Sequence, residues 1–153
     1  MILLLRVDHR MLHGQVAFSW TNSIEADCIL IANDGVAGDE LRKTTMKLAK
    51  PQGAKLVIKN IVDSIEALKT GVTDKYRLLI VVESVEDAYK IVNDVESIKS
   101  INLGGVKTKE GSRNISKAVN LLPEEEDKLR KLISKGIEIE IRQLPTDSKV
   151  MYK

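Results

Sequence analysis

The chain has 153 residues, of which 43% are hydrophobic, so it is long enough to bury a sizeable core. Its 24 lysine and arginine residues are nearly balanced by 22 aspartate and glutamate residues, and the two signs are interspersed along the chain. Without a basic block, the composition gives no indication of nucleic-acid binding. We expect a single domain over residues 1–153.

The sequence also bears on the cellular compartment. Cys28 is the only cysteine, so no internal disulfide can form, as is usual in a reducing environment. The apolar run Ile2–Leu5 is too short for the core of a signal peptide, and charged residues follow it at once. No stretch approaches the length of a membrane span. We therefore predict a cytoplasmic protein.

Continuous apolar runs alternate with segments of helical periodicity in the first half of the chain. Such runs are typical of strands that are buried on both faces. The predicted strands are Ile2–Leu5, Cys28–Ala32, Leu56–Ile58 and Leu78–Val82.

Each of these strands is followed by a predicted helix. The first begins near Gly14, and the four-residue spacing of Val16, Trp20 and Ile24 gives it one apolar face that would pack on the sheet. The second runs over 39–49, the third starts at a capping Asn60, and the fourth starts at Ser84.

The last third of the chain continues this pattern. We predict a short strand over Ser100–Leu103, a polar loop over Gly104–Asn114 and another strand over Ser116–Leu121. Pro123 then opens a helix that Gly136 ends. Residues 137–142 alternate strictly between apolar and charged side chains, which predicts an edge or antiparallel strand with one buried and one exposed face.

Alternating strands and helices predict an α/β fold with a mainly parallel central sheet of about six to seven strands. Helices would cover both faces, and an antiparallel strand would form an edge. Ligands of such sheets bind beyond the carboxyl ends of the strands. The polar segments Asp8–His13, Asn33–Gly35 and Asn102–Gly105 follow predicted strands, so we expect them to border one site.

The turn from Asp8 to His13 is the strongest candidate for chemistry. His13 falls where the first helix begins, and the N–H groups and dipole of a helix start suit a phosphoryl group and favour a neutral imidazole. A neutral imidazole beside an anion site is a candidate nucleophile for phosphate. From this one residue alone, however, an exposed histidine in a first helical turn is the more common explanation.

Neighbouring residues supply what phosphoryl transfer needs. The backbone N–H groups of Gly14, Gln15 and Val16 would bind phosphoryl oxygens, and Gly14 would let a partner approach. Arg10 would add a charge-assisted contact worth about 1.5–3 kcal/mol. Asp8 would hold either Arg10 or the imidazole.

Other chemistries find less support in the sequence. His9 and His13 have the spacing of two metal ligands on a helix, but no third histidine or cysteine lies near them, so we predict no metal site. The dinucleotide fingerprint is missing after the first strand, so we predict no cofactor. Arg6 and Arg142 are either structural ion pairs or phosphate ligands, and Trp20 is interpreted as a core residue.

The segment Arg6–Val16, followed by Trp20, closely resembles the opening of the enzyme IIB component of the mannose/fructose/sorbose family of bacterial phosphotransferase systems. That family reads approximately R-I-D-D-R-L-I-H-G-Q-V and then W. The likeness covers almost the whole chain, because it continues at Asn33–Asp34, Asn102–Gly105, Ser116–Val119 and Gly136–Pro145.

The resemblance implies a phosphoryl-carrier subunit, a protein-histidine phosphotransferase of a sugar phosphotransferase system. His13 would receive a phosphoryl group from a phosphohistidine on the IIA component and pass it to a sugar bound by membrane IIC and IID components. Asp8 and Arg10 match the active-site loop of the family and would support His13. The chain has no room for a fused IIA domain, so we expect a separate IIA protein and peripheral association with the membrane partners.

This sequence departs from the family at His9, where a second aspartate is usual. The exchange leaves open which histidine carries phosphate, and we favour His13 because it alone precedes Gly-Gln-Val at the helix start. The alternative function is a non-catalytic regulatory or metal-binding module that uses His9 and His13. The sequence does not disclose the sugar, and homo-oligomer formation stays open.

Overall fold

The computed structural model describes residues 1–153 and is built around a seven-stranded sheet of order β3-β2-β4-β1-β5-β8-β9. The first six strands in this order pair in parallel, and only β9 runs antiparallel to its neighbour. The mainly parallel α/β fold is therefore confirmed. The strands are β1 (Ile2–Asp8), β2 (Cys28–Ala32), β3 (Lys55–Lys59), β4 (Leu78–Val82), β5 (Ser100–Gly105), β8 (Glu138–Ile141) and β9 (Val150–Met151).

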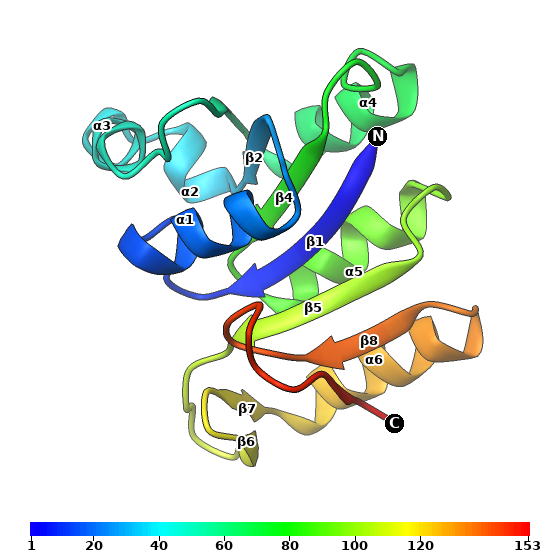
Figure 1. Cartoon of the computed structure of the whole chain (residues 1–153). Coiled ribbons are helices and arrows are strands. Elements are labelled where there is room, and N and C mark those ends of the chain that lie inside the picture. The colour runs from blue at the N-terminus through cyan, green and yellow to red at the C-terminus, as the bar shows by residue number, and fades with distance from the viewer.

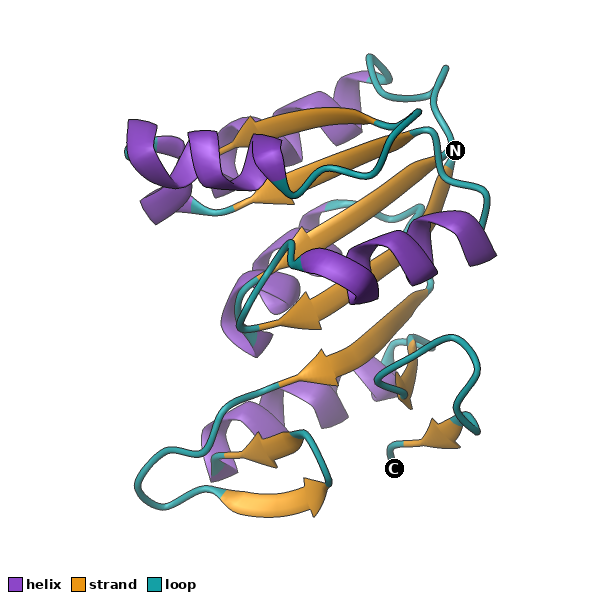
Figure 2. Ribbon diagram, turned by 60° about the vertical axis from the view of Figure 1, so that its left-hand side comes forward, coloured by secondary structure: helices purple, strands orange, loops and turns teal.

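Helices cover both faces of this sheet (Figures 1 and 2). One face carries α1 (Gly14–Ser23), α2 (Asp34–Ala37) and α3 (Glu40–Leu48), and the other carries α4 (Ile61–Thr70), α5 (Val85–Asp94) and α6 (Pro123–Ser134). None of these helices combines the length and the apolar character that crossing a membrane requires.

Two hydrophobic clusters fill the space between the sheet and its helices. In β1, Leu4 packs in the cluster that contains Trp20 of α1, whereas Leu5 and Val7 pack in the cluster on the opposite face. Successive side chains of a strand point to opposite faces, so a strand covered on both sides needs a continuous apolar run. This explains why the central strands were recognisable in the sequence.

Helix starts follow the predicted capping residues. The side chain of Asn60 accepts a hydrogen bond from the Asp63 N–H at 2.7 Å, and that of Ser84 accepts one from the Asp87 N–H at 3.1 Å. Each cap satisfies an N–H group that has no partner inside its helix. The first helix begins at Gly14, as expected.

The strand predicted over residues 137–142 is β8, and its antiparallel pairing is confirmed on one side, where it pairs with β9. On its other side β8 pairs in parallel with β5, so the edge of the sheet is β9, a strand that was not predicted from the sequence. The expected exposed face is also incomplete, because Glu140 is buried with its Oε2 atom 3.0 Å from Nε of Arg142. An ion pair allows this charged side chain to lie inside the fold.

The segment Ser116–Leu121, expected to be a single strand, instead forms the turn and the second strand of a hairpin. β6 (Arg113–Ser116) and β7 (Val119–Leu121) pair with each other as a separate antiparallel sheet. The amide of Asn114 donates to Oδ1 of Asn120 across the hairpin at 2.9 Å. The hairpin lies next to the segment that leaves the carboxyl end of β5 (Figure 1).

Candidate functional site

The candidate site lies where β1 ends, between β4 and β5. Val7 pairs with Leu103 of β5, but Asp8 pairs with Gly105, so the register shifts by one residue and Gly104 is passed over. A β-bulge of this kind redirects side chains at the end of a strand. Here it brings Arg6 and Asp8 against the glycine pair of β5.

The glycine pair makes room for these two side chains. A Cβ atom on Gly104 would overlap the guanidinium group of Arg6, and one on Gly105 would lie 3.0 Å from Oδ1 of Asp8. Any side chain at position 104 would therefore displace the Arg6 guanidinium group. The Asn102–Gly105 segment thus joins the site, as predicted, and its glycines are what allow the charged pair to approach the strand.

Arg6 is a buried structural partner of Asp8. Its guanidinium group lies 3.0 Å from Oδ2 of Asp8 and donates to Oδ1 of Asn102 at 2.6 Å. It also donates to the carbonyl oxygen of Arg142 at 3.2 Å. Its side chain is only 3% exposed. Of the two roles considered for Arg6, the geometry supports the ion pair.

Asp8 is the point on which the charges of the turn converge. Its Oδ1 atom accepts from the backbone N–H of Arg10 at 3.0 Å and from Nε of Arg10 at 3.1 Å. Its Oδ2 atom lies 3.2 Å from Nε2 of His13. Burial alone would raise the pKa of Asp8, but the hydrogen bonds from Arg10, the charge of Arg6 and the bond to His13 outweigh it and lower the pKa.

This carboxylate fixes the state of the imidazole. An ionised carboxylate only accepts hydrogen bonds, so Nε2 of His13 must carry the proton that it donates to Asp8. The other ring nitrogen, Nδ1, makes no hydrogen bond in the protein and is not buried. In the neutral ring, Nδ1 holds the free electron pair. His13 therefore presents an oriented nucleophilic nitrogen at the surface.

His13 also caps α1, with an extended backbone and no side-chain bond to the helix. None of the backbone N–H groups from Leu12 to Val16 donates a hydrogen bond within the protein. Consecutive free donors at the positive end of a helix are the kind of groups that bind anions in proteins. Met11 and Gly14 help to shape this helix start through left-handed φ angles of 57° and 35°.

The remaining predicted residues differ in their involvement. Arg10 is 39% exposed and reaches Asp8 from the surface, whereas the exposed Gln15 makes no side-chain hydrogen bond. His9 donates its backbone N–H to the carbonyl oxygen of Gly105, but its Nδ1 atom is buried without a partner. No group of three histidine, cysteine, aspartate or glutamate side chains is placed to hold a metal ion.

The Asn33–Gly35 segment does not join the site, contrary to expectation. β4 lies between β1 and β2, so the ends of β1 and β2 are not neighbours. Asn33 caps α2 through a bond from the Val36 N–H, and Asp34 accepts from the Ile61 N–H at the start of α4. The polar side chains that were expected to border the site are therefore used in capping bonds at the starts of α2 and α4.

Trp20 contacts both of the arginines whose roles the sequence leaves open. Trp20 is 1% exposed, and the guanidinium carbons of Arg6 and Arg142 lie 5.2 and 5.0 Å from the centre of its ring. Its Nε1–H donates to the carbonyl oxygen of Gln143 at 2.9 Å. Trp20 is thus a core residue, as predicted, and it also braces Arg6.

Comparison with known proteins assigns the chain to a family. The family model of the PTS system sorbose subfamily IIB component matches residues 2–153, where PTS is the phosphoenolpyruvate-dependent phosphotransferase system. The chain belongs to this family. The IIB component is 34% identical over 156 residues to a probable phosphotransferase enzyme IIB component of Streptococcus pyogenes, covering 98% of this chain and 96% of that relative.

Two further proteins place this IIB component within its family. It is 31% identical to the mannose-specific EIIAB component of Escherichia coli, over 96% of this chain but only 46% of that longer relative. Its fold matches the crystal structure of the IIBSor domain of the sorbose permease from Klebsiella pneumoniae with a TM-score of 0.92 and 28% identity, covering 98% of this chain and 92% of that one. The IIB component is thus part of a sugar phosphotransferase system.

Proposed function

We propose that this IIB component carries a phosphoryl group on Nδ1 of His13, which it receives from a phosphorylated IIA protein and passes to a sugar. The observation that carries the proposal is the bond between Nε2 of His13 and the ionised Asp8. It leaves Nδ1 as the ring nitrogen with a free electron pair beside the free N–H groups of Leu12–Val16.

The chemistry consists of two displacements at phosphorus. In the first, the Nδ1 electron pair of His13 forms a bond to phosphorus while the phosphorus–nitrogen bond of the donor histidine breaks, and its electrons return to the donor ring. In the second, a sugar hydroxyl oxygen bonds to phosphorus, the bond to Nδ1 breaks, and the hydroxyl proton is released to solvent. No cofactor is required for either displacement.

Each residue of the turn has a role in these steps. Positive charge develops on the imidazole as Nδ1 bonds to phosphorus, and the Asp8 carboxylate at Nε2 stabilises it. The free N–H groups of the helix start would bind the equatorial phosphoryl oxygens. Arg10 is exposed enough to contact them while its Nε atom stays bonded to Asp8.

The comparisons support a role as the IIB component of a sugar phosphotransferase system. The partners are inferred from the names of the relatives. The name of the Escherichia coli relative joins IIA and IIB activities, and that of the Klebsiella pneumoniae structure refers to a sorbose permease. We infer that this IIB component works with a phosphorylated IIA protein and with IIC and IID permease components in the membrane. The sugar is not assigned.

The test is phosphorylation of the purified protein with phosphoenolpyruvate, the general phosphotransferase proteins and the matching IIA protein. Phosphorus NMR should show one phosphohistidine, and coupling to nitrogen-15 in the labelled ring should identify Nδ1. His13→Ala should abolish the signal. His9→Ala is the matched control, since it removes the neighbouring imidazole but should leave the phosphohistidine in place.

Three results would contradict the proposal. They are an unlabelled wild-type protein, a label that persists in His13→Ala but not in His9→Ala, and a phosphoryl group attached to Nε2. The last would mean that the bond between His13 and Asp8 does not decide which nitrogen reacts.

A further inference from the structure

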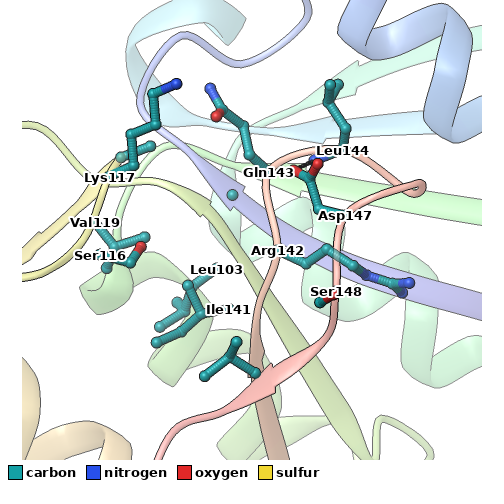
Figure 3. Close-up of a pocket in the computed structure, with 13 residues that line it drawn as sticks. Leu103, Ser116, Lys117, Val119, Ile141, Arg142, Gln143, Leu144, Asp147 and Ser148 are labelled. Carbon is teal, nitrogen blue, oxygen red and sulfur yellow. Dashed lines mark hydrogen bonds between the residues drawn. The ribbon is translucent and has the colours of Figure 1, made fainter.

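A pocket of about 410 Å3 opens beyond the carboxyl ends of β5 and β8, next to the turn of the β6–β7 hairpin (Figure 3). Its volume lies within the roughly 300–1,000 Å3 of small-molecule sites. The proposed roles of His13, Asp8 and Arg10 do not use it. Its lining comes from the end of β5, the turn of the hairpin and the segment between β8 and β9.

The pocket has an apolar end and a polar end. The side chains of Leu103 and Ile141 lie at one end, and those of Lys117 and Gln143 extend toward the other (Figure 3). Asp147 and Ser148 add a carboxylate and a hydroxyl to the lining. A sugar presents apolar C–H faces and a rim of hydroxyl groups, so it requires both kinds of surface.

The polar lining also includes donors that the protein does not use. The backbone N–H groups of Lys117, Ala118, Gln143 and Ser148 donate no hydrogen bond in the structure. The ammonium group of Lys117 is exposed and has no carboxylate partner, whereas Arg142 is paired with Glu140. One free cation beside free N–H groups suits a single phosphate ester.

The pocket adjoins the transfer site. Gly104 lines the pocket and faces the Arg6 guanidinium group, while the next residue, Gly105, faces the Asp8 carboxylate that binds His13. The short contacts along this path place the pocket wall on the order of 10 Å from the His13 ring. The transfer site and the pocket are therefore connected through adjacent residues of β5.

We infer that this pocket is a binding site for a phosphorylated hexose, the product of transfer from His13, with the phosphate at Lys117 and the ring against Leu103 and Ile141. The inference rests on the proposed function for the identity of the ligand. The binding itself needs no phosphorylated protein, because neither His13 nor Asp8 lines the pocket.

The experiment is a nitrogen-15 NMR titration of the unphosphorylated protein with mannose 6-phosphate and fructose 1-phosphate. Amide shifts should move at Lys117, Ala118, Gln143 and Ser148. The parent hexoses and inorganic phosphate should each bind at least tenfold more weakly, because each supplies only half of the contacts. Lys117→Gln should weaken binding of the sugar phosphate about tenfold.

Lys107→Gln is the matched control. Lys107 is exposed on the segment that leads to the hairpin but does not line the pocket, so the same loss of charge should leave the affinity unchanged. Absent shifts, equal binding of inorganic phosphate, or an equal effect of Lys107→Gln would each overturn the inference. Equal binding of inorganic phosphate would identify a simple anion site.

The titration of His13→Ala separates this inference from the proposed function. The variant should bind the sugar phosphate with wild-type affinity, even though it should not be phosphorylated. If binding persists but wild-type His13 is not phosphorylated by the IIA system, only the proposed transfer fails. If phosphorylation is normal but no amide of the pocket shifts, only the inference about the pocket fails.

Discussion

The buried carboxylate of Asp8 loses its hydration in the fold, and the contacts that replace this hydration also orient His13. A carboxylate without solvent is strongly destabilised unless partners replace its hydration. Three groups supply them here, since Arg6, Arg10 and His13 all lie within 3.3 Å of its oxygens. The same contacts keep Asp8 ionised, and this determines which nitrogen of His13 carries the proton.

Asp8→Asn tests whether the contacts of Arg6, Arg10 and His13 with the Asp8 carboxylate stabilise the fold. At pH 7 the variant leaves Arg6 buried without its counter-charge, so the free energy of unfolding should fall by about 3 kcal/mol. Because the folded pKa of Asp8 lies below its ordinary value of 3.8, the ion pairs stabilise the fold above about pH 4 and are lost as the pH falls through the folded value. Urea unfolding at pH 7 and pH 3 should show the difference between the two proteins shrinking at pH 3. A difference of the same size at both values would show that Asp8 is not stabilised as a carboxylate.

Arg10→Ala tests the second cation at the turn. Arg10 is partly exposed, so its loss should change the free energy of unfolding by no more than about 1 kcal/mol. Phosphoryl transfer to His13 should nevertheless slow about tenfold to a hundredfold, since a charge-assisted contact to the phosphoryl group is lost. Initial rates of phosphorylation by the IIA protein give the measurement. Arg130→Ala removes a surface arginine that pairs with Glu126 on α6 and should leave the rate unchanged. Equal rates for wild type and Arg10→Ala would exclude Arg10 from the transfer.

At the scale of elements, the end of β1 depends on the backbone of β5. The register shift between Val7 and Asp8 is possible because Gly104 and Gly105 offer no side chain to the two charged residues. Arg6 is held in turn by Trp20 on α1 and by the carbonyl oxygen of Arg142 after β8. The orientation of His13 is thus determined by three elements besides the turn itself.

Gly104→Ala should disrupt the contact between the end of β1 and the backbone of β5. The added Cβ atom would overlap the Arg6 guanidinium group, so Arg6 must move away from Asp8 and the free energy of unfolding should fall by about 2–3 kcal/mol. Gly38→Ala is a matched control, because its Cβ would meet only the Asp34 carbonyl oxygen at 3.8 Å. That variant should stay within about 1 kcal/mol of wild type. Urea unfolding distinguishes the two, and equal stability of both variants would mean that the close approach of Arg6 is not required.

The elements also show what local sequence can predict. Continuous apolar runs located the central strands, and Asn60 and Ser84 marked helix starts, because burial on both faces and capping leave signals within a few residues. The hairpin of β6 and β7 and the short edge strand β9 left no such signal. β9 has only the two residues Val150–Met151, and its pairing depends on the position of β8.

At the scale of the whole molecule, the strand order decides which loops meet. His13, Asp8 and Arg10 were predicted to act together because they are close in sequence, and the glycines of β5 were placed at the same edge. The exclusion of Asn33–Gly35 and the entry of Arg142 follow from β4 and β5 lying on either side of β1. That order is a long-range property, which local periodicity does not contain.

Tyr152, which follows β9, is hydrogen-bonded to α6 rather than to the transfer site. The hydroxyl of Tyr152 donates to Oε1 of the buried Glu126 at 2.6 Å, and its backbone N–H donates to the carbonyl oxygen of Ile139. Burial, with the hydrogen bond to Glu126, raises the pKa of Tyr152 to about 12. Because the folded pKa exceeds the ordinary value of 10.0, this contact stabilises the fold below about pH 10 and is lost as the pH rises toward 12.

Tyr152→Phe should therefore lower the free energy of unfolding by about 1–2 kcal/mol at pH 8, because Glu126 loses a hydrogen bond. Other groups also titrate at high pH, so the comparison of the two proteins isolates Tyr152. Urea unfolding should show their difference vanishing by about pH 12, while the rate of His13 phosphorylation at pH 8 stays the same in both. A difference that persists at pH 12 would show that packing of the ring, rather than the hydroxyl, holds the end of the chain. A slower phosphorylation would show that this anchor extends to the end of β1.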